Sequence, residues 1–360
     1  MRIGNAARVL TTLGCGSVLL CGLLAAPASA EGAAAAPAVA APLTLAGRTE
    51  LPGYSGDFDH FEVDLKGNRL FLAAEDHATL EVFDLKSVGP TKTIEGFEVP
   101  HGLLFMPETN RMIVTDSGPG LSKVVDMTTY KVTGTMGKVP GADSMAYDPS
   151  RKHLYVITGG RDAKMKDSYL SEFDPATGQL IGELAFPTDK VEGIAIEQKG
   201  NRLFVNVTGK NTLAVVNKNT RAVVATWPIK EAEQNAPLAM DESTHRLFVV
   251  TRKPGKLVIV NADTGATVAS FKAPERTDQV LWDAAAKRIY VLGGEGYIGV
   301  FQQTDADHYA EIARVPSATG AKTGILVPEL GKLFVAVSPG EGKTGGAVLQ
   351  FDVAQGVAGK

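Results

Sequence analysis

The chain has 360 residues, with 36 lysines and arginines against 40 aspartates and glutamates, and its formal net charge is −4 at pH 7. This acidic balance argues against nonspecific attraction to nucleic acid or to an anionic lipid surface. The two cysteines, Cys15 and Cys21, both lie within the first 30 residues. Once that segment is removed, no thiol remains for a disulfide, a zinc–thiolate site or covalent haem attachment.

The first 30 residues have the pattern of a secretory signal peptide. A start with two arginines precedes a mostly apolar run at residues 9–24, and small residues follow up to Ala30, as a signal peptidase requires. We expect cleavage after Ala30 and a periplasmic or extracellular protein. A lipid-modified Cys21 is the alternative, and it is disfavoured because the large Leu20 precedes that cysteine. The apolar run is too short and too interrupted to leave a membrane-spanning segment in the mature chain.

Residues 31–42, EGAAAAPAVAAP, predict a disordered leader because alanine and proline alone cannot bury a core. Residues 43–360 are expected to form a single domain, because one motif recurs along all of them. It consists of a polar residue, an aliphatic residue and a further apolar residue: Arg69-Leu70-Phe71, Arg111-Met112-Ile113, His153-Leu154-Tyr155, Arg202-Leu203-Phe204, Arg246-Leu247-Phe248, Arg288-Ile289-Tyr290 and Lys332-Leu333-Phe334. The aliphatic positions are separated by 42, 42, 49, 44, 42 and 44 residues, which is the period of propeller blades.

Each period contains four short apolar runs separated by glycine, asparagine and aspartate, as residues 192–227 show. Such runs predict four antiparallel strands joined by tight turns. One such sheet cannot bury both of its faces, so we expect the sheets to stack radially in a closed ring. The predicted fold class is all-β, a seven-bladed β-propeller of four-stranded antiparallel blades. The last period lacks a fourth strand, and we expect residues 43–52 to supply it by pairing with residues 347–353.

The run RLFVNVTGKNTLAVVN at residues 202–217, with its counterparts at 153–158 and 246–251, resembles the YVTN-repeat family of secreted bacterial β-propellers, also called YncE-like. The likeness covers essentially the whole chain after residue 42. It implies a seven-bladed propeller similar in fold to the quinoprotein amine dehydrogenase heavy chain and to seven-bladed lactonases. The rival WD40 family is disfavoured because no blade has a Gly-His start and a Trp-Asp end.

A set of polar residues is expected at the mouth of the central channel. The inner strands start eleven residues before each aliphatic position of the motif, and these places hold Asp59, His101, Asp143, Glu192, Ala236, Asp278 and Lys322. Because strand starts from adjacent blades converge there, the polar residues among them are candidate ligand-binding residues. Four neighbours extend this candidate set: His60, and the turn residues Glu75, Asp76 and His77.

Part of this set has the chemistry of a metal site. Carboxylates are suitable ligands for calcium, whereas a transition metal would be bound mainly through an imidazole nitrogen. The candidate ligands of such a divalent cation are Asp59, His101, Asp143 and Glu192. The alternative is that these groups are solvated at a water-filled mouth and hold no ligand.

The remaining motifs are predicted to have structural roles. The sequence GEGKTG at residues 340–345 matches a phosphate-binding pattern, but a strand-like run and no helix follows it, which favours a flexible loop. Acidic residues recur six residues before the aliphatic position, and they are predicted turn formers because aspartate accepts backbone hydrogen bonds: Asp64, Asp148, Glu197, Asp241 and Asp283. Trp227 and Trp282 are predicted to pack between blades. No G-x-S-x-G or H-E-x-x-H motif occurs in the sequence.

These observations favour a binding or scaffold module over an enzyme. Its top face, which includes a distinctive loop at residues 160–167, is expected to bind a protein, a glycan or a small molecule, and the protein is expected to be a monomer. The alternative is a metal-dependent, lactonase-like hydrolase, in which a cation polarises a carbonyl group and a carboxylate or histidine activates water. A third possibility is an electron-transfer subunit. The sequence contains no recognisable cofactor ligand, so such a subunit would need a partner that carries the redox centre.

Overall fold

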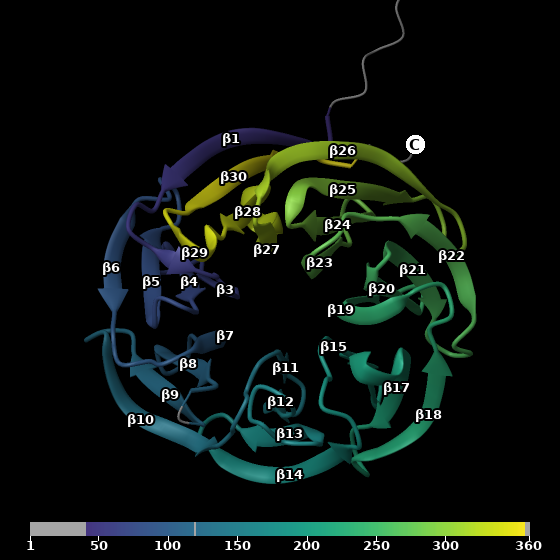
Figure 1. Cartoon of the computed structure of the whole chain (residues 1–360), viewed down its shortest axis with the longest axis horizontal. Helices are drawn as coiled ribbons and strands as arrows, with labels where there is room; N and C mark the ends of the chain where they lie inside the picture. Colours follow the sequence, from purple (N-terminus) through teal and green to yellow (C-terminus); the bar gives the residue numbers. More distant parts are fainter. Residues whose placement is uncertain (1–40, 119, 357–360) are drawn as a thin grey trace, which may run out of the picture. The chain divides into compact units, whose positions relative to one another are not determined.

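The computed structural model describes residues 41–118 and 120–356. The predicted signal peptide and most of the predicted leader therefore lie outside the described residues. Within the described part, seven four-stranded antiparallel sheets surround a common centre (Figure 1). The prediction of an all-β, seven-bladed propeller is confirmed.

Blades are numbered here by the order in which their innermost strands occur in the chain. The inner strands are β3 (Phe61–Asp64), β7 (Pro100–Met106), β11 (Met145–Asp148), β15 (Ile194–Ile196), β19 (Glu233–Asp241), β23 (Thr277–Asp283) and β27 (Ala321–Val327). The second strands are β4 (Arg69–Ala74), β8 (Arg111–Asp116), β12 (His153–Gly159), β16 (Arg202–Val207), β20 (Arg246–Lys253), β24 (Arg288–Gly293) and β28 (Lys332–Val337).

Two further layers complete each blade. The third strands are β5 (Thr79–Asp84), β9 (Leu121–Asp126), β13 (Ser168–Asp174), β17 (Thr212–Asn217), β21 (Gly255–Asn261), β25 (Glu295–Gln303) and β30 (Ala347–Val353). The outermost strands are β6 (Pro90–Ile94), β10 (Lys131–Lys138), β14 (Gln179–Phe186), β18 (Ala222–Pro228), β22 (Thr267–Lys272), β26 (Tyr309–Thr319) and, for blade 7, β1 (Leu43–Glu50).

The recurring motif supplies the contacts between blades. Its polar residue is the first residue of the second strand in every blade. The two apolar residues that follow point to opposite faces of the sheet, because side chains alternate along a strand. Leu70 packs with blade 7, whereas Phe71 packs with Met112 of blade 2. The same relation joins Tyr290 of blade 6 to Leu333 of blade 7, so each blade buries the faces of its two neighbours.

The outermost strand of blade 7 comes from the beginning of the described chain. β1 pairs antiparallel with β30, from Leu43 opposite Val353 to Glu50 opposite Ala347 (Figure 1). Leu43 is buried in the core between blades 6 and 7, and Leu51 is buried between blades 7 and 1. Both ends of the propeller sequence therefore lie in one sheet.

The glycine-rich motif at residues 340–345 is extended. Its residues form β29 (Gly340–Thr344), which pairs with the short strand β2 (Ser55–Gly56) in a separate two-stranded sheet. The next element is the strand β30, so the motif lacks the helix N-terminus that a phosphate-binding loop requires.

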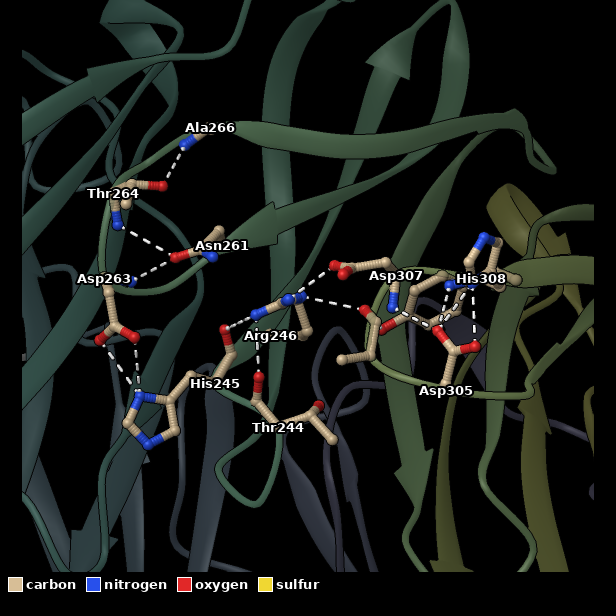
Figure 2. A network of polar contacts seen from close by, with 12 residues as sticks. Thr244, His245, Arg246, Asn261, Asp263, Thr264, Ala266, Asp305, Asp307 and His308 are labelled. Atoms are coloured by element: carbon tan, nitrogen blue, oxygen red, sulfur yellow. Dashed lines mark hydrogen bonds and ion pairs between the residues drawn. The ribbon is translucent and has the colours of Figure 1, made fainter.

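Arginines at the starts of second strands connect neighbouring blades at the end of the propeller opposite the inner-strand starts. Figure 2 shows Arg246 of blade 5, which donates to the carbonyl of Ala306 and pairs with Asp307 at 2.6 Å, both after β25 of blade 6. Three other arginines donate to a carbonyl at the equivalent place in the next blade: Arg69 to Met127, Arg202 to Ala262 and Arg288 to Ala354. The basic residue of the motif therefore has a structural role.

Two further assignments from sequence are confirmed. The recurring acidic residues accept hydrogen bonds in the turns between first and second strands, as Asp148 does from the backbone N–H of Ser150 at 3.0 Å. Trp227 packs in the core between blades 4 and 5, and Trp282 packs in the core between blades 5 and 6.

Helical structure in the described residues is limited to two 3₁₀ turns, η1 (Thr208–Lys210) and η2 (Pro328–Leu330). None of the helices in residues 41–118 and 120–356 has the length and hydropathy needed to cross a membrane.

Candidate functional site

The residues aligned at the inner-strand starts converge on one cavity, which we call the channel-mouth cavity. Its volume is about 460 Å³. Six of the seven aligned residues line it: Asp59, His101, Asp143, Glu192, Asp278 and Lys322. The seventh, Ala236, lines a smaller cavity of about 90 Å³ that shares Glu192 and Asp278 with the larger one.

Of the four neighbouring candidates, His60 and Glu75 also line the channel-mouth cavity. The other two have different surroundings. The carboxylate of Asp76 accepts a hydrogen bond of 2.8 Å from a backbone N–H in the loop before β3. The ring of His77 packs against Tyr54, with 4.4 Å between the ring centroids. Both residues are exposed, and neither lines the cavity.

Glu192 forms ion pairs with two cations, and the sequence alone did not predict these ion pairs. Lys190 Nζ lies 2.9 Å from one of its carboxylate oxygens, and the Arg252 guanidinium lies 3.2 Å from it. Lys190 is also 3.8 Å from Asp162, which is the contribution of the loop at residues 160–167 to the cavity wall. Glu192 is therefore engaged in ion pairs and does not group with the other three predicted metal ligands.

The ion pairs continue around the cavity to blade 1. Arg252 also pairs with Asp278 of blade 6. Lys322 of blade 7 lies 2.8 Å from Asp278 and 2.8 Å from Asp57, which precedes β3 of blade 1. A continuous series of opposite charges thus connects the blades on this side of the cavity.

The other side of the cavity contains a chain of hydrogen bonds between blades 1 and 2. The Nδ1 atom of His101 lies 2.7 Å from Asp59 Oδ2, and the Nε2 atom lies 2.9 Å from Ser117 Oγ. His60 is a second neighbour of Asp59 at a longer distance, with 3.5 Å between His60 Nε2 and Asp59 Oδ1. Both ring nitrogens of His101 therefore have a hydrogen-bond partner.

Three of the four predicted metal ligands lie close together. Asp59, His101 and Asp143 each offer one ligand atom, and these atoms all lie within 4.8 Å of one another. Two carboxylates and an imidazole are donors that calcium or a transition metal accepts. Because His101 uses both ring nitrogens, a cation bound by its imidazole would have to replace one of those two hydrogen bonds.

Two carboxylates lining the cavity have no ion pair or side-chain hydrogen bond within the described residues. Burial and the nearby charge of Glu192 raise the pKa of the Asp143 carboxyl to about 6. Burial and the charge of Asp59 raise the pKa of the Glu75 carboxyl to about 8. At neutral pH the Asp143 carboxyl is therefore mostly ionised without a cation of its own among the described residues, whereas the Glu75 carboxyl is mostly protonated.

The protonation of His101 follows from its carboxylate neighbours. Burial alone lowers the pKa of the imidazole, but the hydrogen bond to Asp59 and the charges of Asp59 and Asp143 outweigh it and raise the pKa to about 10. Burial raises the pKa of Asp59, but His60 and His101 outweigh that effect and hold it well below its usual range. At neutral pH these two residues form an imidazolium–carboxylate pair.

A second alignment of the sequence would have identified residues that the first alignment missed. The position five residues after the aliphatic residue of the motif follows the second strand in most blades, and it holds Glu75, Ser117 and Arg252 in blades 1, 2 and 5. All three residues line the channel-mouth cavity. The turns after the second strands and the inner-strand starts thus meet at the same end of the propeller.

These features define a seven-bladed β-propeller with a charged cavity at one end of its axis. The sequence matches no protein-family model and no curated protein. Among solved structures, the chain is similar to "Kuenenia stuttgartiensis Hydrazine Synthase", with a TM-score of 0.67 and 14% identity over 79% of this chain and 92% of that one. It is also similar to "Crystal Structure of Mitotic Checkpoint Complex", with a TM-score of 0.69 and 15% identity over 94% of this chain and 99% of that one. At these identities the likeness shows the fold alone.

Proposed function

We propose that this protein is a binding module that holds the positively charged group of a small polar ligand in the channel-mouth cavity. The observation that carries the proposal is that Asp143 and Glu75 face the cavity without an ion pair among the described residues. Of the ligand classes considered from sequence, a small molecule fits best, because the candidate residues line a cavity of about 460 Å³.

The charge of the lining supports a cationic ligand. Seven acidic side chains line the cavity: Asp57, Asp59, Glu75, Asp143, Asp162, Glu192 and Asp278. They outnumber the three lysine and arginine side chains, Lys190, Arg252 and Lys322, together with the imidazolium of His101. Each of the three cations is already engaged in ion pairs with these acids. A bound positive charge between Asp143 and Glu75 would stabilise the ionised form of both groups, whose pKa values are raised by burial and by the charges of Glu192 and Asp59.

Divalent cations are the simplest probes of this proposal. We expect calcium, manganese or zinc to release or absorb heat when titrated into metal-free protein by calorimetry. The Asp143→Asn variant keeps the side-chain volume but removes one charge, so it should bind the cation at least about tenfold more weakly. Asp162→Asn is the matched control, because that carboxylate is more than half exposed and lies 3.8 Å from its only cation. The absence of heat from all three ions would overturn the proposal.

A second candidate is a metal-dependent hydrolase that opens lactones at the same cavity. The grouping of Asp59, His101 and Asp143 within 4.8 Å favours it, because a cation held there would polarise a carbonyl oxygen of a substrate in the cavity. We expect a chelator to abolish turnover in a screen of lactones, and an excess of the metal to restore it. Turnover that persists in the chelator would exclude this candidate.

We also propose that the chain belongs to the secreted YVTN-type, YncE-like propellers. The support is the sequence itself, namely the repeat at residues 202–217 and the signal-peptide pattern that ends at Ala30. N-terminal sequencing of protein recovered from the periplasm or the medium tests the export and the cleavage site together.

A further inference from the structure

The chain of hydrogen bonds on the acidic side of the cavity joins a serine, a histidine and an aspartate in a functional order. Ser117 Oγ lies 2.9 Å from His101 Nε2, and His101 Nδ1 lies 2.7 Å from Asp59 Oδ2. A nucleophilic serine next to Nε2 and an orienting aspartate at Nδ1 are the arrangement by which hydrolases activate serine, on unrelated folds and in any chain order. We propose that Ser117 is the nucleophile of an acyl-hydrolase site, with His101 as its general base and Asp59 as the residue that orients the imidazole.

The backbone fixes the position of each of the three residues. The N–H of Asp59 donates to the carbonyl of Ala73 at 2.9 Å, and the N–H of Ser117 donates to the carbonyl of Val99 at 3.1 Å. His101 is the second residue of β7, next to the turn that carries Ser117. All three residues line the channel-mouth cavity, so a substrate in that cavity can reach Ser117.

The proposed reaction uses only these side chains and water. Ser117 Oγ attacks the carbonyl carbon of an ester or lactone while its proton passes to His101 Nε2. The tetrahedral intermediate collapses, the carbon–oxygen bond to the leaving alcohol breaks, and Nε2 returns the proton to that alcohol. Water then attacks the acyl-serine and gives a proton to Nε2. The bond to Oγ breaks, the proton returns to Oγ, and a carboxylic acid is released.

The lining of the cavity indicates the substrate class. The Asp143 carboxylate, which has no ion pair among the described residues, would repel an anionic acyl group, so the substrate is a small neutral or cationic ester or lactone. This inference goes beyond the proposed binding function and does not require a bound cation.

Three carboxylates surround the imidazole of His101: Asp59 before β3, Glu75 after β4 and Asp143 before β11. Among the described residues, Asp59 is the one within hydrogen-bond distance of Nδ1, so it is the residue that holds the ring with Nε2 next to Ser117.

A fluorophosphonate probe tests the proposal, because it forms a covalent bond with an activated serine. We expect intact-mass spectrometry of the full chain, labelled over a range of pH, to show one added group mapped to Ser117. Ser117→Ala should abolish the label, and His101→Gln should slow it at least about a hundredfold. Ser55→Ala is the control, because Ser55 is exposed, lies outside the lining of the channel-mouth cavity and should leave the rate unchanged. A thermal melt of each variant shows whether it is folded.

Three results would overturn the proposal: no label at any pH, a label that survives in Ser117→Ala, or a rate that His101→Gln leaves unchanged in folded protein. Loss of labelling in a chelator would also overturn it, in favour of the metal-dependent candidate. The cation titration is a separate measurement. If the cations release or absorb heat but Ser117 is not labelled, the binding function is supported and the nucleophile proposal is wrong. If Ser117 is labelled but no cation releases or absorbs heat, the nucleophile proposal is supported and the binding function is wrong.

Discussion

Deleting residues 41–50 should remove most of the stability of the propeller. These residues form β1, which pairs with β30 at seven positions from Leu43 to Glu50 and buries Leu43 between blades 6 and 7. Each ladder hydrogen bond contributes about 0.5–1.5 kcal/mol net, and a buried leucine about 1.5–3 kcal/mol. Their loss, on the order of 5 kcal/mol, is comparable with the whole stability of many domains, about 5–15 kcal/mol. Urea denaturation should therefore show a much lower midpoint or no cooperative transition.

The matched control is a chain that begins at residue 41, because it keeps β1 and lacks only what precedes it. It should unfold at the same urea concentration as the full-length protein. A truncated chain beginning at residue 51 that melts like this control would show that β1 does not close the ring. A second variant, Leu43→Ala, keeps the strand and should cost about 2–5 kcal/mol through the lost side chain alone.

The fold could be predicted from sequence because the same physical requirement recurs in every blade. The second strand needs one large apolar side chain on each face. A pair of apolar residues, such as Leu70-Phe71, therefore recurs with a period of forty-odd residues. The arginine before the pair was visible in the pattern, but its function was not. Its contact with a carbonyl in the next blade, as between Arg202 and Ala262, depends on side-chain conformation.

The location of the candidate site could be predicted from the sequence, but the interactions of its side chains could be predicted only in part. The alignment of inner-strand starts located the cavity, because every blade presents the same end of the same strand to the axis. It could not show that Glu192 is neutralised by Lys190 and Arg252, since those residues come from different positions of their blades. It also missed Ser117, because that residue lies at another position of its blade, in the turn after the second strand.

Replacing Lys218 with methionine should destabilise the protein by about 3–5 kcal/mol, because it leaves a buried carboxylate without its cation. Lys218 Nζ donates to Asp148 of blade 3 at 2.7 Å and to the carbonyl of Glu197 of blade 4 at 2.7 Å. The side chains of Lys218 and Asp148 are 1% and 0% exposed. This ion pair is therefore held in the interior between two blades, where solvent does not screen it. Urea denaturation at pH 7 would measure the loss.

The double variant Lys218→Met/Asp148→Asn separates the ion pair from packing, because it removes both charges together. It should lose less stability than the sum of the two single variants, by an interaction energy of at least about 1 kcal/mol. The pH dependence gives a second measure. Burial raises the pKa of Asp148, but Lys218 and Ser150 outweigh it, so the folded-state pKa lies below the unfolded value of about 3.9. The pair's contribution is present above that value and disappears as the pH falls through the folded-state pKa, because the folded protein then binds the proton it had excluded. Additive losses in the single variants would show that the two charges do not stabilise each other.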